Sequence, residues 1–303
     1  MKPKRIVTLS IIACLLLGLL AGCKPQFQPG AFTDDAGRQV NIEEVPETIV
    51  SFGPSVTEIL FALGLGDKVV GVDMYSDYPE EATSKPYVGD AWNPSIESIV
   101  ALEPDLVVTV ESEQLTSELE ALGFTYIVLD PEDFYSIADD FRLAGEVTGN
   151  RAEGEELAVD IEEAIDDVTE RVQGADKPKV FFIVDATDPN MPWTSGSLSF
   201  IHDIITIAGG ENIAAWVADD FVEISIEEIV DAEPDIIVVQ TWGGGIPTIT
   251  AEELEEHIIW QQLEAVKEGR IYFIEGDLIS RFGPRILQGL EQMARIIHPE
   301  LFD

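Results

Sequence analysis

The chain has 303 residues, of which 58 are Asp or Glu and 17 are Lys or Arg, so its formal net charge is −41. Such an acidic surface argues against binding to nucleic acid or to anionic lipid, because both are themselves negatively charged. The two cysteines are Cys14 and Cys23. Once a leader that ends before Cys23 is removed, a single cysteine remains, which excludes a disulfide and a cysteine metal cluster.

Residues 1–22 are predicted to be a signal peptide. Three basic residues precede the apolar run Ile6–Leu20: Lys2, Lys4 and Arg5. The Leu-Ala-Gly-Cys sequence that ends at Cys23 resembles a bacterial lipobox, which implies cleavage before Cys23 and acylation of its sulfur. The alternative is an ordinary secretory signal with an incidental cysteine. Losing the three basic residues changes the net charge from −41 to −44, and residues 23–32 are expected to be a lipidated tether.

Residues 33–135 are predicted to form an N-terminal α/β lobe. Strands and short helices alternate along it, which is typical of a parallel sheet. Ser55 and Glu58 have capping-box spacing at the start of a helix that Gly64 ends. The expected strands are 48–52, 68–72, 106–110 and 126–129, and the expected helices are 55–63 and 96–102.

A repeat links the two halves of the chain. Nine of fourteen residues recur between Ser95–Val108 and Ser225–Val238 at a constant offset of 130 positions. The shared pattern, Ser-Ile-Glu followed by Glu-Pro-Asp and an apolar run, predicts a short capped helix, a stop at proline and a buried strand. A chain with two copies of this unit is expected to have two similar lobes and a ligand cleft between them.

Residues 136–174 are predicted to connect the lobes. Apolar residues recur there at three- and four-residue steps with acidic residues between them, and no proline occurs before Pro178. This pattern favours a single long amphipathic helix that starts near Ser136, with a bend at Gly149 left open. The C-terminal lobe is then 175–303, with strands 180–184, 236–240 and 270–274 and helices 198–207, 226–232 and 285–297.

Enzyme signatures are absent from the sequence. There is no Gly-x-Ser-x-Gly motif, and Gly243–Gly245 lacks the Lys-Ser/Thr of a phosphate-binding loop. His202, His257 and His298 have no metal-ligand spacing. We therefore expect neither catalysis nor a bound metal or cofactor.

Aromatic residues instead follow the predicted strands in both lobes. Tyr75 and Trp92 occur in the first lobe, and Trp193 and Trp242 occur in the second. Ligands of open α/β sheets bind outside the carboxyl ends of the strands, and aromatic rings there suit a large, flat ligand. For any one of these rings, anchoring of its own loop is an equally good reading.

Several segments resemble the class III, helical-backbone substrate-binding proteins of ABC importers, which serve corrinoids, iron-siderophores and haem. The resemblance covers nearly all of 33–302 and rests on 49–71, the two repeat copies, 194–196, 209–212 and 282–285. Residues 75–79 most resemble the cobalamin-binding branch. The fold that this implies is two similar lobes with parallel-type sheets, joined by a single long α-helix.

The resemblance also implies roles for individual residues. Tyr75 and Trp92 would line the first wall of the cleft, Trp193 and Phe221 the second, and Asp277 and Arg281 would contact the ligand. Some cobalamin binders have another tryptophan just beyond the first repeat strand, where this chain has Val110 and Glu111. The exact corrinoid is therefore left open.

Glu97 and Glu227 occupy equivalent positions in the two repeat copies. They match the paired glutamates with which the family docks on the permease and its ATPase. The alternative is that each acid merely stabilises the first turn of its helix, by about 0.3–1 kcal/mol. The resemblance favours docking.

Together these features predict a monomeric, lipid-anchored, extracytoplasmic binding protein that delivers a corrinoid to an ABC permease. A siderophore or haem binder is the alternative within the class, although Lys and Arg are scarce for an anionic ligand. An exported corrinoid-modifying enzyme and an adhesive surface lipoprotein are the alternatives outside it.

Overall fold

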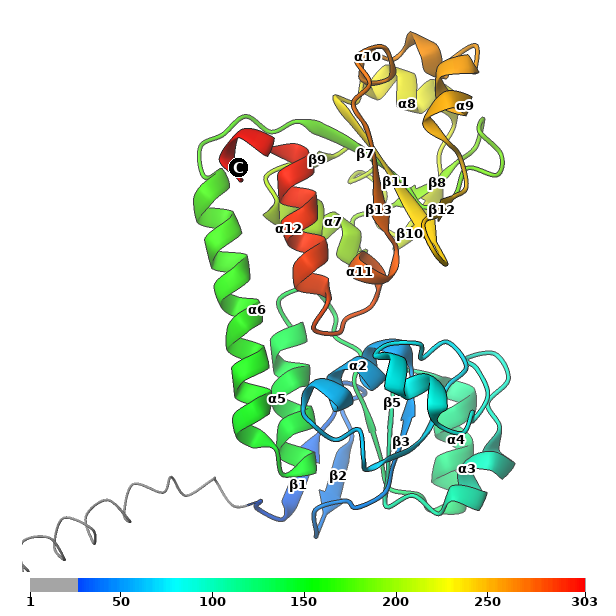
Figure 1. Cartoon of the computed structure of the whole chain (residues 1–303), viewed down its shortest axis with the longest axis vertical. Helices are drawn as coiled ribbons and strands as arrows, with labels where there is room; N and C mark the ends of the chain where they lie inside the picture. Colours follow the sequence, from blue (N-terminus) through cyan, green and yellow to red (C-terminus); the bar gives the residue numbers. More distant parts are fainter. Residues whose placement is uncertain (1–26, 303) are drawn as a thin grey trace, which may run out of the picture.

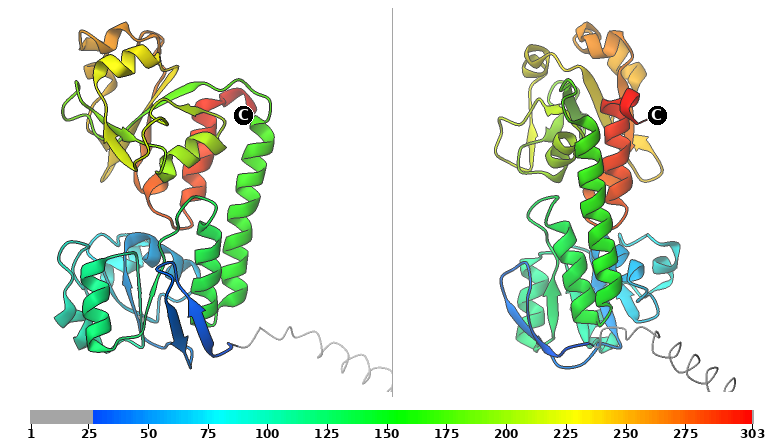
Figure 2. Two further views of the ribbon diagram at one scale, coloured as in Figure 1. Left: turned by 180° about the vertical axis from the view of Figure 1, so that it is seen from behind. Right: turned by 90° about the vertical axis from the view of Figure 1, so that its left-hand side faces the viewer.

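The structure is a computed structural model, and it describes residues 27–302. The predicted signal peptide and Cys23 lie outside the described residues. Two α/β lobes are stacked along the long axis of the molecule, and α6 (Arg151–Val172) runs along one side of both (Figure 1). The views from behind and from the side show the same arrangement (Figure 2).

The N-terminal lobe is built on a parallel sheet with the strand order β4-β3-β5-β6. Alternate residues of β3 and β5 belong to different apolar clusters, one shared with α2 and α5 and the other with α3 and α4. Both faces of the sheet are therefore covered, which explains its continuous apolar strands. The elements are β1 (Gly30–Thr33), β2 (Gln39–Ile42), β3 (Ile49–Phe52), α2 (Pro54–Ala62), β4 (Val69–Val72), η2 (Glu80–Ser84), α3 (Ile96–Leu102), β5 (Leu106–Thr109), α4 (Glu113–Leu122) and β6 (Tyr126–Val128).

The C-terminal lobe contains the parallel strand order β9-β7-β11-β13, with β12 added antiparallel to the end of β11. Strands β8 and β10 form a separate antiparallel pair. The elements are β7 (Lys179–Ile183), β8 (Trp193–Ser195), α7 (Phe200–Ile207), β9 (Glu211–Asn212), β10 (Phe221–Glu223), α8 (Ile226–Ala232), β11 (Ile236–Trp242), β12 (Ile246–Pro247), α9 (Ala251–Glu256), η3 (Trp260–Gln262), α10 (Glu264–Lys267), β13 (Ile271–Glu275), α11 (Asp277–Ser280), α12 (Ile286–Ile297) and η4 (Pro299–Leu301).

The two parallel sheets have the same topology. In each lobe the first strand along the chain pairs with the second on one side and with the third on the other, and the fourth pairs with the third. The repeat copies are α3 with β5 and α8 with β11, as the sequence predicts. Both helices end at a left-handed glutamate, with φ of 46° at Glu103 and 52° at Glu233.

The aspartate of each Glu-Pro-Asp unit joins the repeat strand to its neighbour. Asp105 Oδ2 accepts hydrogen bonds from the backbone N–H groups of Glu47 (2.9 Å) and Thr48 (3.0 Å). Asp235 Oδ2 accepts the equivalent bond from Lys179 N–H at 2.8 Å. The bonds from the Glu47 and Thr48 amides lower the pKa of the Asp105 carboxyl against the opposing effect of burial. This half of the repeat therefore fixes strand order.

The prediction of one helix from Ser136 to Val172 is wrong. The segment forms two helices packed side by side, α5 (Ile137–Thr148) and α6, and only α6 joins the lobes. Gly149 ends α5 in the left-handed region at φ 78°, and the chain reverses there. Gly145 and Gly154 permit the close packing, since a Cβ on Gly154 would lie 2.5 Å from the Phe141 carbonyl oxygen.

The predicted capping box at Ser55 is also wrong. Helix α2 starts at Pro54 with Gly53 as its N-cap, and no side chain caps it. Ser55 lies inside the first turn, and Glu58 points to the other lobe, as described below. Proline at the first helical position accounts for the early start, because its ring fixes a helical φ and its missing N–H needs no partner.

Within residues 27–302, no helix combines the length and apolar character needed to cross a membrane.

Candidate functional site

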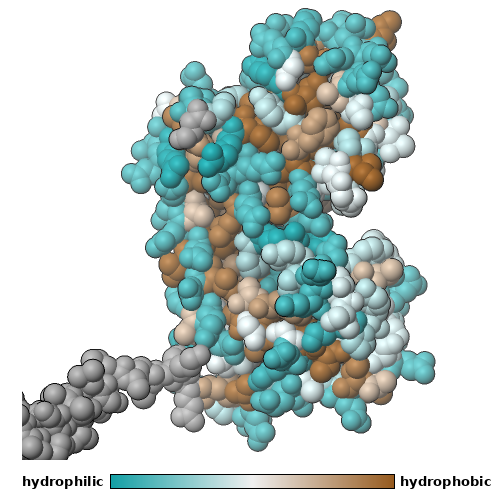
Figure 3. All heavy atoms as spheres, in the orientation of Figure 1, coloured by the Kyte–Doolittle hydropathy of each residue, from teal (hydrophilic) through white to brown (hydrophobic). Residues whose placement is uncertain are grey.

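A cavity of about 470 Å³ lies between the lobes at the carboxyl ends of their strands. The surface is visibly hollowed between the lobes on the side away from α6 (Figure 3). The lining comes from the segment after β6, the start of α7, β10, the end of β11 and the α11–α12 region: Asp130, Pro131, Glu132, Leu198, Ser199, Phe200, Ile201, Asp220, Phe221, Trp242, Ile279, Ser280 and Phe282. The predicted position of the site agrees with this cavity.

Of the three aromatic residues predicted for the second wall, two line the cavity and the third, Trp193, lies nearby on β8. Phe221 and Trp242 line the cavity directly. Trp193 lies on β8 opposite Glu223 of β10, and Ser195 lies opposite Phe221. Residues directly opposite in an antiparallel pair share a face, and so do alternate residues of one strand, so Trp193 is on the same face as Phe221. Trp242 is the last residue of β11, whereas the sequence placed it in a loop.

Tyr75 and Trp92, which are predicted to form the first wall, lie side by side. Their ring centroids are 6.1 Å apart in an edge-to-face arrangement. Asp73 Oδ1 accepts the Tyr75 N–H at 2.8 Å, and Asp90 Oδ1 accepts the Trp92 N–H at 2.9 Å. These short turns hold rings that are 48% and 71% exposed, although neither ring lines the cavity itself. Exposed aromatic rings on ordered turns are typical of a binding surface.

The two predicted polar contacts, Asp277 and Arg281, occupy one end of an ion cluster. Arg281 Nη2 lies 3.0 Å from Asp277 Oδ1, and Arg281 Nη1 lies 2.6 Å from Asp77 Oδ1 on the other lobe. Arg281 Nη1 is also 3.7 Å from Glu58 Oε1. The structure therefore places both residues beside the first wall, with the arginine already engaged by carboxylates.

Asp130, Phe200 and Phe282 were not predicted as site residues, yet they line the cavity. Burial, reinforced by the nearby Glu111 and Asp35 carboxylates, raises the pKa of Asp130 to about 6. Phe200 and Phe282 stack with ring centroids 3.8 Å apart. Asp130 follows strand β6, so applying the strand-end rule to that strand would have found it.

Glu97 and Glu227 are exposed in the first turns of α3 and α8. Neither takes part in capping, because the Ser95 hydroxyl accepts the Ser98 N–H and Ser225 forms its capping box with Glu228. Both helices lie on the side of the molecule away from α6, one in each lobe (Figure 1). Their carboxylates thus face solvent on both lobes.

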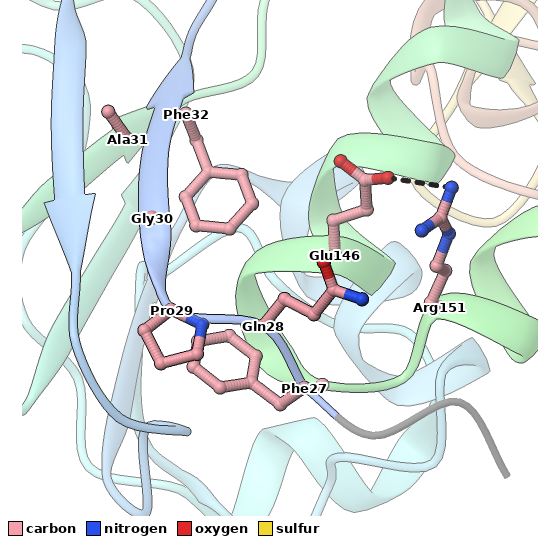
Figure 4. A pocket seen from close by; sticks show the side chains of 9 residues that line it. Phe27, Gln28, Pro29, Gly30, Ala31, Phe32, Glu146 and Arg151 are labelled. Carbon is pink, nitrogen blue, oxygen red and sulfur yellow. Dashed lines mark ion pairs between the residues drawn. The ribbon is translucent and has the colours of Figure 1, made fainter.

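A second cavity of about 470 Å³ lies where the described chain begins. Phe27, Gln28 and Phe32 lie on one side of it, and Glu146 and Arg151 form an ion pair of 3.5 Å on the other (Figure 4). It contains none of the predicted site residues, and its lining includes no residue from the carboxyl ends of the parallel strands. No group of three or more His, Cys, Asp or Glu side chains in residues 27–302 is placed to hold a metal.

Comparison with known proteins gives consistent matches. The family model described as periplasmic binding protein matches residues 49–278. An uncharacterized ABC transporter substrate-binding lipoprotein of Bacillus subtilis (strain 168) is 33% identical over 315 residues, which covers 96% of this chain and 98% of the relative.

Two solved structures are similar along most of the chain. The periplasmic vitamin B12 binding protein of Vibrio cholerae has a TM-score of 0.72 and 26% identity, covering 84% of this chain and 97% of its own. The periplasmic haem-binding protein of Roseiflexus sp. RS-1 has a TM-score of 0.72 and 27% identity, covering 84% and 99%.

Proposed function

The chain belongs to the periplasmic binding protein family, and from this premise we propose that it captures a corrinoid in the cleft between its lobes and delivers it to an ABC permease. At the coarser level it is the extracytoplasmic substrate-binding component of an ABC importer, within the group that serves vitamin B12, siderophores and haem. Its relatives bind cargo for transport and are not enzymes. The predicted family and two-lobed fold are confirmed.

The charge of the cleft is the observation that favours a corrinoid. Among the described residues that line the cavity, three are acidic and none is Lys, Arg or His. The nearest arginines, Arg281 and Arg285, already face the carboxylates of Asp77, Asp277 and Glu58. Anionic ferric siderophores and the propionates of haem need unpaired cations, whereas the amide groups on a corrin ring donate hydrogen bonds that carboxylates accept.

The aromatic walls fit the same ligand. In this proposal Tyr75 and Trp92 supply one wall and Trp193, Phe221 and Trp242 supply the other, so that a rigid ring bound between them would be contacted on both faces. Each aromatic contact contributes about 0.5–1.5 kcal/mol beyond the area that it buries. A rigid ligand between preformed walls loses little conformational freedom, which favours tight binding.

Delivery depends on Glu97 and Glu227 in this proposal. Each is exposed, neither caps its helix, and the two occupy equivalent positions in the first turns of α3 and α8. Two exposed acids on opposite lobes match two basic sites on a permease dimer. The protein acts as a monomer held at the membrane by the lipid on Cys23, a role supported by the Bacillus relative, which is named as a lipoprotein.

Equilibrium dialysis tests the ligand. The purified chain from Lys24 onward is dialysed separately against cyanocobalamin, an anionic ferric catecholate and haem, and bound ligand is measured by its own visible absorbance. The proposal predicts saturable binding of cyanocobalamin and much weaker binding of the other two. Failure to bind cyanocobalamin, together with binding of haem or the catecholate, would overturn the choice of ligand.

A further inference from the structure

A cluster of charged side chains joins the two lobes, with Glu58 buried at one end and Asp77 exposed at the other. Arg285 approaches Glu58 with two hydrogen bonds, Nε to Oε2 at 3.0 Å and Nη2 to Oε1 at 2.6 Å. Arg281 joins Asp77 of the N-terminal lobe to Asp277 of its own lobe. Figure 1 shows the segment between α11 and α12, which contains Arg281 and Arg285, above α2, which contains Glu58.

The Glu58–Arg285 pair is withdrawn from solvent. The Glu58 side chain is 1% exposed and that of Arg285 is 13% exposed. Burial raises the pKa of the Glu58 carboxyl, and the hydrogen bond and charge of Arg285 act against that rise. A two-bond arginine–carboxylate pair also fixes the relative orientation of its partners.

Close approach of the two lobes at this point depends on glycine. A Cβ on Gly283 would lie 2.9 Å from both Cβ and Oε2 of Glu58. Any larger residue there would displace the carboxylate that Arg285 holds. The four residues 282–285, Phe-Gly-Pro-Arg, therefore supply both Arg285 and, at Gly283, the space that the Glu58 side chain occupies.

The pair lies beside the loop of the first wall, and Arg285 follows Phe282 of the cavity lining by three residues. The Arg285 guanidinium lies 4.0 Å from the centre of the Tyr78 ring, in the same loop as Tyr75. On the other side, Phe282 stacks on Phe200, and both line the cavity. Displacement of Arg285 would therefore remove its contact with Tyr78, and it would move Phe282 only through the intervening Gly283 and Pro284.

We propose that Glu58 and Arg285 are a positioning pair, which sets the separation and angle of the two cleft walls before the ligand arrives. The inference rests on the proposed function, since it deepens the account of that same cleft. Along α6 the two lobes share one continuous apolar cluster. We therefore expect the lobes to stay packed together on the α6 side, which would act as the hinge edge. Loss of the pair lets the lobes rotate about that edge, because an unpaired buried charge gains hydration as the contact opens.

Distances between spin labels in the ligand-free protein test this directly. The chain from Lys24 onward has no cysteine, so Glu118→Cys on α4 and Glu255→Cys on α9 provide two unique, exposed attachment sites. Glu58→Gln should move the distance distribution to longer values and broaden it. Arg285→Lys, which keeps the charge but not the two-bond geometry, should do the same to a smaller extent.

The matched control is Glu291→Gln, which removes an exposed 2.7 Å pair with Arg295 on α12 and should leave the distances unchanged. Cyanocobalamin should restore the original distribution in Glu58→Gln, with affinity about tenfold lower if about a tenth of the molecules keep the binding arrangement. A purely local role predicts a lower melting temperature with unchanged distances, and that result would overturn the proposal.

Both variants are first checked for native circular dichroism, and if Glu58→Gln does not fold, Arg285→Lys decides the outcome. The distance measurement needs no ligand. A failure of the unsubstituted protein to bind cyanocobalamin would therefore count against the proposed function and leave the positioning pair to be judged separately.

Discussion

Replacing Asp140 with asparagine should stabilise the protein at neutral pH. Asp140 lies on α5 and is 2% exposed. Burial, together with a hydrogen bond and charge repulsion from Asp35, raises its pKa from 3.8 to about 10. The folded protein therefore holds a proton on this carboxyl at pH 7, whereas the unfolded chain does not.

The sign and size follow from this difference in proton binding. Between about pH 4 and about pH 10 the folded state binds one proton more than the unfolded state, so stability falls by about 1.4 kcal/mol for each pH unit gained. At neutral pH the accumulated cost is at most about 4 kcal/mol. Asparagine avoids this cost, because its neutral amide donates to the Asp35 carboxylate as the protonated acid does.

Urea denaturation of the signal-free chain measures the effect. The gain of Asp140→Asn over the unsubstituted protein should be about 2–4 kcal/mol near pH 7 and should shrink toward zero near pH 4. Asp160→Asn, an exposed change on α6, is the control and should stay within about 0.5 kcal/mol at every pH. A destabilised Asp140→Asn, or a gain that does not vary with pH, would refute the reasoning.

Three further predictions concern the cleft, the permease and the anchor. In dialysis, Trp193→Ala and Phe221→Ala should each weaken cyanocobalamin binding about 5- to 30-fold, which equals about 1–2 kcal/mol of binding free energy. The control is Ile258→Ala, a change at an exposed residue. Equal effects at all three positions would argue against the second wall. Glu97→Ala with Glu227→Ala should reduce uptake of labelled cobalamin in cells without changing affinity; parallel loss of binding would count against docking. Cys23→Ser should abolish incorporation of labelled fatty acid and release the protein from the membrane fraction, and continued labelling would rule out this anchor.

Local patterns predicted the parts of the fold that local interactions determine. The repeat units were found because a serine cap, a proline stop and an apolar strand form a pattern that fits within fourteen consecutive residues. The alternation of strands and short helices predicted parallel sheets, whereas the strand order was not predicted and came from the structure. The separate helices α5 and α6 were missed because the helical periodicity continues through Gly149, and only the left-handed turn there reveals the reversal.

The site residues also divide into those that local sequence patterns reveal and those that only the folded chain brings together. Tyr75, Trp92 and Trp242 could be expected from their positions at or just after strand ends. Glu58 could not, since its capping-box spacing is an ordinary local signal and its true partner, Arg285, is 227 residues away. Phe200 and Phe282 reach the cleft only because α7 and the α11–α12 segment meet in the folded lobe.

A crystal structure of the protein grown with cyanocobalamin tests the central claim most directly. The account predicts the corrin ring between Tyr75 and Trp92 on one side and Phe221 and Trp242 on the other, with Glu58 still paired to Arg285. A ligand bound outside the inter-lobe cleft, such as in the cavity beside Phe27 and Arg151, would contradict it.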